Sequence, residues 1–124
     1  MKFDSNLEKK LYAEMKSCTY HPEQKIHYIQ ARTYEPDFVY YDGKIIIYIE
    51  VKGRFRDRAE ARKYIDVREC LGKREDLVFV FQNPNTPMPG SKRRKDGSRY
   101  RMRDWAEKNG FDWYTPSTLP KEWL

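Results

Sequence analysis

Residues 36–52 have the sequence PDFVYYDGKIIIYIEVK. Two apolar runs, Phe38–Tyr41 and Lys44–Ile49, flank the pair Asp42-Gly43, which is a strong signal for a two-residue type I′ hairpin. The second run is apolar at successive positions, as expected of a central strand that is covered on both faces. The segment therefore predicts a β-hairpin whose second strand lies in the middle of a sheet.

The same hairpin brings charged residues together. Counting outward from a two-residue loop places Asp37 opposite Tyr48. Side chains alternate along a strand, so Tyr48, Glu50 and Lys52 share one face, and directly paired residues share a face as well. Two carboxylates and one ammonium group are therefore expected to converge at one end of the sheet.

These three charged residues have the chemistry of a metal site. Mg²⁺ prefers oxygen ligands and takes one or two protein carboxylates, with water and phosphate completing its shell. Asp37 would bridge two such ions and Glu50 would hold one, while Lys52 would orient or deprotonate the attacking water and counter the charge on phosphate. The alternative is a surface ion pair between Glu50 and Lys52, with Asp37 merely opening the strand. Because charges at the end of a buried strand are costly unless paired or metal-bound, the metal site is favoured.

The remaining elements predict one mixed α/β domain, in the order helix, strand, hairpin, helix, strand, helix. Hydrophobic periodicity and capping residues mark each of them. The expected elements are a helix from the Ser5 cap to near Cys18, a strand at Ile26–Ile29, a helix from the Asp57 cap to about Leu71 with Ala61, Tyr64, Ile65 and Leu71 inward, a buried strand at Leu77–Phe81, a helix with Met102, Trp105 and Ala106 inward and Gly110 at its end, and a last turn with Pro120 at its first position. Residues 83–98 contain three prolines and two glycines and predict a long mobile basic loop.

The chain has 124 residues and a formal net charge of +6, which favours a polyanionic partner such as nucleic acid. Cys18 and His21 have a C-x-x-H spacing, but no second ligand pair follows, so neither a zinc site nor a disulfide framework is expected. Met1-Lys2-Phe3-Asp4 leads into charge, and no apolar stretch reaches membrane-spanning length. A reduced cytoplasmic protein is expected.

Basic residues cluster beside the expected site, where they would neutralise phosphates near the cut and on a neighbouring DNA arm. A solvated basic face is the alternative, and His21 and His27 are interpreted as ordinary structural residues. The candidate DNA-binding residues are Arg54, Arg56, Arg58, Arg62, Lys63, Lys92, Arg93, Arg94 and Lys95.

Pro36-Asp37 followed by Glu50-Val51-Lys52 resembles the PD-(D/E)xK nuclease superfamily, which implies a restriction-endonuclease-like α/β (α+β) fold with a four-stranded mixed sheet flanked by helices. The resemblance extends over nearly the whole chain to the endonuclease I family of tailed bacteriophages. It is carried by Tyr34–Phe38, the hairpin, Glu50–Gly53, the basic helix, Val78–Phe81, Trp105–Phe111 and Leu119–Trp123.

This resemblance implies a homodimeric, Mg²⁺-dependent endonuclease that resolves four-way (Holliday) junctions, with Mn²⁺ as a substitute ion and two ions per site. It implies an intertwined dimer in which residues 1–32 are exchanged, and a place in the cytoplasm of an infected bacterial host. Asp37, Glu50, the Val51 backbone carbonyl and Glu8 would be the metal ligands. Glu8 has a second interpretation, because it would also complete a capping box with Ser5. No organic cofactor or membrane is expected.

Two other functions stay open on the sequence alone. The same chemistry would serve a nuclease that acts on ordinary duplex or single-stranded DNA. A basic DNA-binding protein without catalysis is the second. Metal dependence of cleavage separates the catalytic hypotheses from the non-catalytic one.

Overall fold

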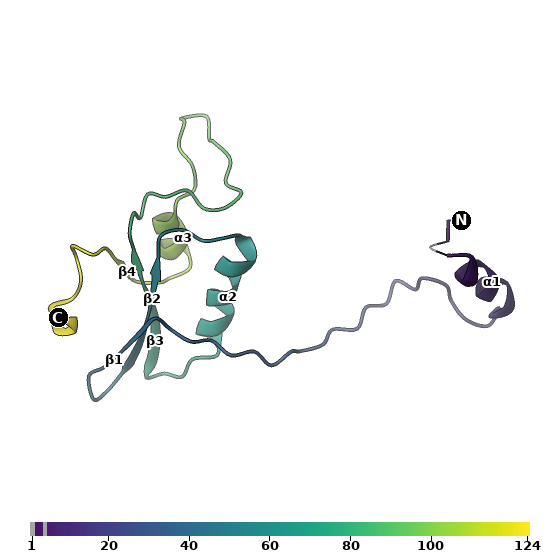
Figure 1. The fold of residues 1–124 in the computed structure, drawn as a ribbon, viewed down its shortest axis with the longest axis horizontal. Helices are drawn as coiled ribbons and strands as arrows, with labels where there is room; N and C mark the ends of the chain where they lie inside the picture. Colours follow the sequence, from purple (N-terminus) through teal and green to yellow (C-terminus); the bar gives the residue numbers. More distant parts are fainter. Residues whose placement is uncertain (1, 4) are drawn as a thin grey trace. The chain divides into compact units, whose positions relative to one another are not determined.

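A computed structural model describes residues 2–3 and 5–124 (Figure 1). Met1 and Asp4, part of the segment in which no signal peptide is expected, lie outside the described residues. The chain divides into two units, residues 1–32 and residues 33–124, and each is described by itself. Among the described residues, every helix is too short or too polar to cross a lipid bilayer.

The unit of residues 33–124 is built on a four-stranded sheet in the order β1-β2-β3-β4. Strands β1 (Phe38–Tyr41) and β2 (Ile46–Lys52) are antiparallel, whereas β2, β3 (Glu75–Phe81) and β4 (Trp113–Tyr114) are parallel. The predicted α+β class with a mixed sheet is confirmed. The two-residue strand β4 was not predicted.

The hairpin differs from the prediction in its loop. Tyr41 pairs with Ile46, so the loop has four residues, 42–45, and the prediction of a two-residue loop is wrong. The Asp42 carboxylate accepts hydrogen bonds from the backbone N–H groups of both Lys44 and Ile45, each at 2.8 Å. This side-chain turn engages the N–H groups of Lys44 and Ile45, whereas the Ile45 carbonyl accepts the Asp42 N–H at 3.4 Å, so Lys44 does not pair with Tyr41 as a two-residue loop requires. Gly43 has φ +92°, which favours glycine at this position.

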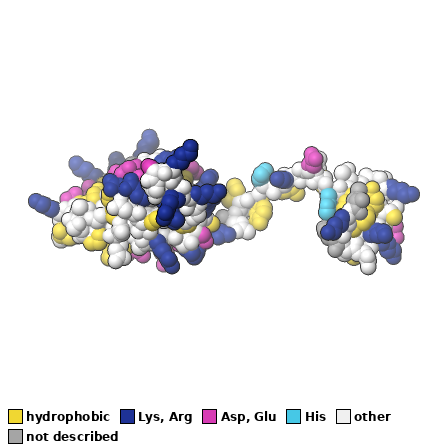
Figure 2. Space-filling view, turned by 90° about the horizontal axis from the view of Figure 1, so that it is seen from above, with side chains coloured by type: hydrophobic (Ala, Val, Ile, Leu, Met, Phe, Trp, Pro, Cys, Tyr) yellow, Lys and Arg dark blue, Asp and Glu magenta, His cyan; other side chains and the backbone are white. Residues whose placement is uncertain are grey.

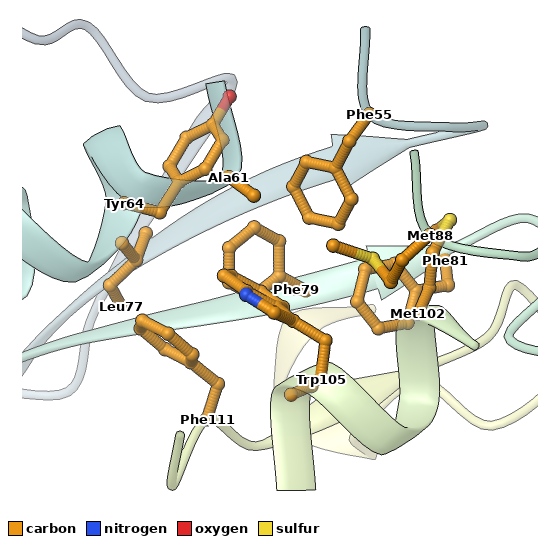
Figure 3. Close-up of a cluster of buried hydrophobic side chains, with 11 residues drawn as sticks. Phe55, Ala61, Tyr64, Leu77, Phe79, Phe81, Met88, Met102, Trp105 and Phe111 are labelled. Carbon is orange, nitrogen blue, oxygen red and sulfur yellow. The ribbon is translucent and has the colours of Figure 1, made fainter. Parts of the chain in front are cut away.

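Helices α2 (Arg58–Glu69) and α3 (Met102–Lys108) pack on one face of the sheet. Figure 3 shows the core cluster between them, with Phe79 of β3 surrounded by aromatic rings. The predicted inward residues of both helices are in this cluster or packed against it. The buried members are Phe55, Ala61, Tyr64, Leu77, Phe79, Phe81, Met88, Met102, Trp105, Ala106 and Phe111, with Ile65 and Leu71 partly buried beside them.

The opposite face of the sheet is only partly covered. Ile49, Val78 and Val80 are buried there, and the 3-10 helix η1 (Lys121–Trp123) contributes Trp123 to the cover. Val51 on this face is 44 % exposed. The prediction that β2 is central is confirmed, whereas its expected cover on both faces is incomplete. Pro120 precedes η1 as its cap instead of occupying the first helical position.

The end residues of α2 and α3 are close to those predicted. Asp57 caps α2 by accepting the Glu60 N–H at 2.8 Å, and the helix ends at Glu69, with Cys70 as its C-cap, before Gly72. Gly110 follows α3 with φ +74°, as expected of a helix C-terminus. The Asp57 cap fixes the residue at which α2 begins after the end of β2.

Residues 83–98 contain no helix or strand, as predicted, but their base is held firmly. Met88 is buried in the core, and its N–H donates to the Tyr100 carbonyl at 2.7 Å. The Arg58 guanidinium donates to the Gly90 carbonyl at 3.0 Å. Side chains from 92 to 99 are exposed. The basic tip is therefore presented from an anchored base.

The unit of residues 1–32 contains α1 (Asn6–Glu14), which Ser5 caps by accepting the Glu8 N–H at 3.1 Å. The helix ends before the predicted Cys18. No residue of α1 is buried, and Leu7 and Met15 are 64 % and 50 % exposed. The predicted strand at 26–29 is wrong: this segment has no regular structure, and Ile29 is 99 % exposed. A short apolar run forms a strand only against a partner strand, and none lies beside it in the described residues.

Candidate active site

The carboxyl-terminal part of β2 presents Tyr48, Glu50 and Lys52 on the face that α2 covers, as strand alternation predicted. Glu50 is 6 % exposed and is the one buried charged residue among the described residues. A carboxylate is rarely buried unless it is paired or ligated. Glu50 is therefore the residue of this strand for which core packing gives no explanation.

Asp37 lies beside Glu50. Continuing the observed register one residue beyond the pair Phe38–Ile49 places Asp37 opposite Glu50, two residues from the predicted partner Tyr48. The shift is even, so Asp37 keeps the predicted face. Its Oδ2 accepts the Val51 N–H at 2.9 Å, which fixes the exposed carboxylate against β2. The four-residue loop thus brings the two carboxylates closer than the predicted register did.

The environment of Glu50 disfavours its charged form. Burial raises the pKa of its carboxyl, and the neighbouring Asp37 carboxylate raises it further. The hydroxyl of Tyr34 donates to Glu50 Oε1 at 2.6 Å and acts in the opposite direction. Burial together with this contact raises the pKa of the Tyr34 hydroxyl above its ordinary range. Tyr34 and the Lys52 ammonium compensate these effects only in part, because the pKa of Glu50 remains raised, and a cation would stabilise the two adjacent carboxylates.

Lys52 supplies the nearest positive charge. Its Nζ lies 3.7 Å from Glu50 Oε2, 3.3 Å from Glu60 Oε1 and 5.4 Å from the centre of the Tyr64 ring. Burial acts to lower the pKa of the Lys52 ammonium, but Tyr64, Glu60 and Glu50 outweigh it and raise that pKa. Lys52 is held as a cation between the sheet and α2.

Glu60 and Tyr34 are site residues that the sequence analysis missed. Glu60 lies in the first turn of α2, where its Oε1 also accepts the Arg56 N–H at 3.1 Å. The spacing of Asp57 and Glu60 is that of a capping box, which would have directed the Glu60 carboxylate back towards the strand end. No sequence signal links Tyr34 to Glu50, because their contact depends on the register of β1.

The donor set fits one Mg²⁺ ion. Among the described residues, no group of three or more His, Cys, Asp and Glu side chains is placed to hold a metal. Asp37 and Glu50 are two carboxylates, which is the number that Mg²⁺ commonly takes from protein before water and phosphate fill its shell. A second ion would need a further ligand from outside this pair.

Glu8, the fourth candidate, belongs to the unit of residues 1–32. Its Oε2 accepts a hydrogen bond from the Tyr20 hydroxyl at 2.5 Å and lies 3.8 Å from His21 Nε2. The Ser5 half of the predicted capping box is present. The Glu8 carboxylate itself is thus engaged by Tyr20 in this unit.

A groove of about 560 Å³ adjoins Lys52. Arg54 and Arg56 line it together with Lys52, and Phe55, Pro87 and Pro89 form apolar walls. These three cations outnumber Glu60, which also lines the groove, so the groove is basic and lies next to the two carboxylates.

The other predicted DNA-binding residues do not line this groove; Arg58, Arg62, Lys92 and Arg94 line a separate hollow between α2 and the 83–98 loop. Figure 2 looks down on the end of the 33–124 unit that carries the 83–98 loop, and many Lys and Arg side chains lie on this face, with some Asp and Glu among them. Lys63 lies over the rings of Tyr34 and Tyr64, at 5.5 and 5.0 Å, and Arg62 pairs with Asp66 at 3.6 Å. The exposed basic residues of the loop are Lys92, Arg93, Arg94 and Lys95.

Comparison with known proteins gives no family assignment. No protein-family model matches the chain, and no curated protein sequence matches it significantly. The site therefore rests on its own geometry, which joins Asp37, Glu50 and Lys52 in one cluster beside a basic groove.

Proposed function

We propose that this protein is a Mg²⁺-dependent endonuclease of restriction-endonuclease-like fold that hydrolyses phosphodiester bonds in branched DNA, with four-way junctions as the main substrate. The observation that carries the proposal is the buried Glu50 carboxylate, placed next to Asp37 and Lys52 at the mouth of a basic groove. A buried carboxylate beside a second carboxylate is costly for stability and is typical of functional sites.

Each residue has a definite role in this proposal. Asp37, Glu50 and the Val51 carbonyl hold the ion, and Mn²⁺ would substitute. The ion would supply Lewis-acid activation of the phosphate and of the attacking water. Lys52 orients that water and stabilises the negative charge that develops on the phosphate. Lys52, Arg54 and Arg56 bind the DNA backbone along the groove.

The junction preference and the dimer follow from the resemblance to the endonuclease I family. A two-fold dimer has two equivalent sites, which suits paired incisions across a junction. The exposed apolar residues of α1 support association with another chain, and Glu8 from an exchanged 1–32 segment would complete a two-ion site. Selectivity would come from the shape of the backbone, since the basic side chains are placed for phosphates.

The substrate preference is tested by competition between a four-way junction and a linear duplex of the same sequence. We expect the junction to be cut at least about tenfold faster in Mg²⁺ at equal salt, because the phosphate contribution depends on ionic strength. Equal cleavage rates on the two substrates would contradict the junction preference and indicate a general DNA nuclease. Tight binding to both DNA substrates without cleavage of either one would indicate a DNA-binding protein without catalytic activity.

Glu60 is expected to position Lys52. Replacing Glu60 with glutamine keeps an acceptor for the Arg56 N–H but removes the charge 3.3 Å from the Lys52 ammonium. The cleavage rate of bound junction should fall by about tenfold, while the dissociation constant for junction changes little, since a displaced catalytic group costs rate more than binding. Single-turnover cleavage and binding in chelator measure the two quantities. A change in binding alone would show that Glu60 acts on the groove instead.

A further inference from the structure

A second hollow lies on the other side of Pro89 from the groove beside Lys52. It has a volume of about 370 Å³ and opens between α2 and the base of the 83–98 loop. Its walls are mostly apolar and come from α2, the loop and α3. The apolar wall residues are Ala61, Ile65, Met88, Pro89, Tyr100 and Trp105. Its size is at the lower end of the range for small-molecule sites, about 300–1,000 Å³.

A hydroxyl group buried in the wall of this hollow has no partner among the described residues. Ser91 lines the hollow, and its Oγ is buried without a hydrogen bond from any described residue. A buried polar group without a partner costs free energy and calls for an explanation. A turn of the Ser91 side chain about its Cα–Cβ bond would bring the hydroxyl to a polar group of an occupant and satisfy it.

The rim of the hollow is cationic. Arg62, Lys92 and Arg94 line it, and of these three only Arg62 has a salt-bridge partner among the described residues, Asp66 at 3.6 Å. The rim therefore has an excess of positive charge above an apolar interior. This combination is complementary to a ligand with a flat apolar body, polar edges and a phosphate.

We infer that this hollow holds one unpaired nucleotide of the DNA substrate, with its base inside and its phosphate on the rim. The base would lie against Ile65 and the aromatic residues Tyr100 and Trp105, and the Ser91 hydroxyl would bond to a polar edge of the base. Aromatic and apolar walls with few polar groups are how proteins hold a base taken out of its stack. Pro89 lines both this hollow and the groove beside Lys52, so the nucleotide would be near the cut strand.

This inference rests on the proposed function and extends it. A branch point has strands whose bases are easily unstacked, and a subsite for one such base would favour branched over continuous DNA. The basic groove alone does not provide that distinction, because phosphate contacts carry no information on pairing.

The test compares two duplexes that differ at a single bulged position, one with 2-aminopurine and one with an abasic residue, in chelator so that neither is cut. We expect the 2-aminopurine bulge to bind at least about fivefold more tightly, which is the lower end of what base stacking contributes. We also expect its fluorescence to fall on binding as the base stacks. Equal affinities with unchanged fluorescence would overturn the inference.

A variant locates the effect. Ser91→Leu fills the hollow and should abolish the preference for the base while leaving the affinity for a fully paired duplex unchanged. Ser117→Leu, the same change at an exposed serine outside the hollow, should keep the preference. If Ser91→Leu keeps the preference as well, the base binds elsewhere. DNA cleavage in Mg²⁺ is measured in a separate experiment. If the protein prefers the base but does not cut, the proposed nuclease activity is wrong and the base-binding subsite stands.

Discussion

Replacing Glu50 with alanine is expected to abolish junction cleavage while leaving junction binding almost unchanged. Glu50 is 6 % exposed, so it offers little surface to the DNA, and its loss removes one of the two carboxylates of the candidate metal position. We expect the cleavage rate to fall by more than about a hundredfold, since losing a residue that only supports a metal ligand already costs about 10–100-fold. Single-turnover cleavage in Mg²⁺ and binding in chelator measure the two effects.

Two further variants make this result specific. Glu50→Gln keeps an acceptor for the Tyr34 hydroxyl and should also be inactive, which separates the carboxylate charge from the packing of the side chain. Glu69→Ala, at an exposed position in the last turn of α2, should cut normally. Cleavage by Glu50→Ala at the normal rate would remove Glu50 from the site.

Replacing Phe79 with alanine is expected to have the largest effect on stability. Phe79 is fully buried, and its ring lies within 5.2–6.0 Å of the rings of Phe55, Tyr64, Phe81, Trp105 and Phe111. Truncating a buried phenylalanine costs about 3–5 kcal/mol. A domain of ordinary stability has about 5–15 kcal/mol in total. Urea unfolding should therefore show a greatly reduced midpoint or a chain already unfolded.

The matched control for Phe79 is on the edge strand β1. Phe38 is 63 % exposed, and Phe38→Ala should reduce the free energy of unfolding by less than about 1 kcal/mol. A loss for Phe79→Ala as small as that for Phe38→Ala would contradict the core described between the sheet, α2 and α3.

The sequence predicted the shared face of Asp37, Glu50 and Lys52 correctly, although it predicted the wrong length for the loop between their strands. The expected loop had two residues and the observed loop has four, so the register of β1 moved by two. Strand side chains alternate with a period of two, and an even shift leaves Asp37, Glu50 and Lys52 on one face. A shift of one residue would have turned Asp37 away from Glu50.

Other features were predictable only where local signals exist. Asp57 and Gly110 are capping residues, and the helices they bound were predicted closely. The prediction of a strand at 26–29 rested on apolar composition alone. An apolar segment does not form a strand without a partner strand. The contact of Tyr34 with Glu50 depends on tertiary packing that no spacing in the chain reveals, whereas the capping-box spacing of Asp57 and Glu60 was a signal for the position of Glu60.

The most direct test of the account is cleavage of a four-way junction with Mg²⁺, Ca²⁺ and chelator side by side. We expect cutting in Mg²⁺ and none in chelator, with binding retained in all three, because Asp37 and Glu50 need a hard cation whereas the basic groove does not. Ca²⁺ prefers more ligands and looser geometry than this pair provides, so it should support binding but not efficient cutting. Cutting at the same rate in chelator, or no cutting in Mg²⁺ by protein that binds the junction tightly, would contradict the assignment of Asp37, Glu50 and Lys52 as a metal-dependent nuclease site.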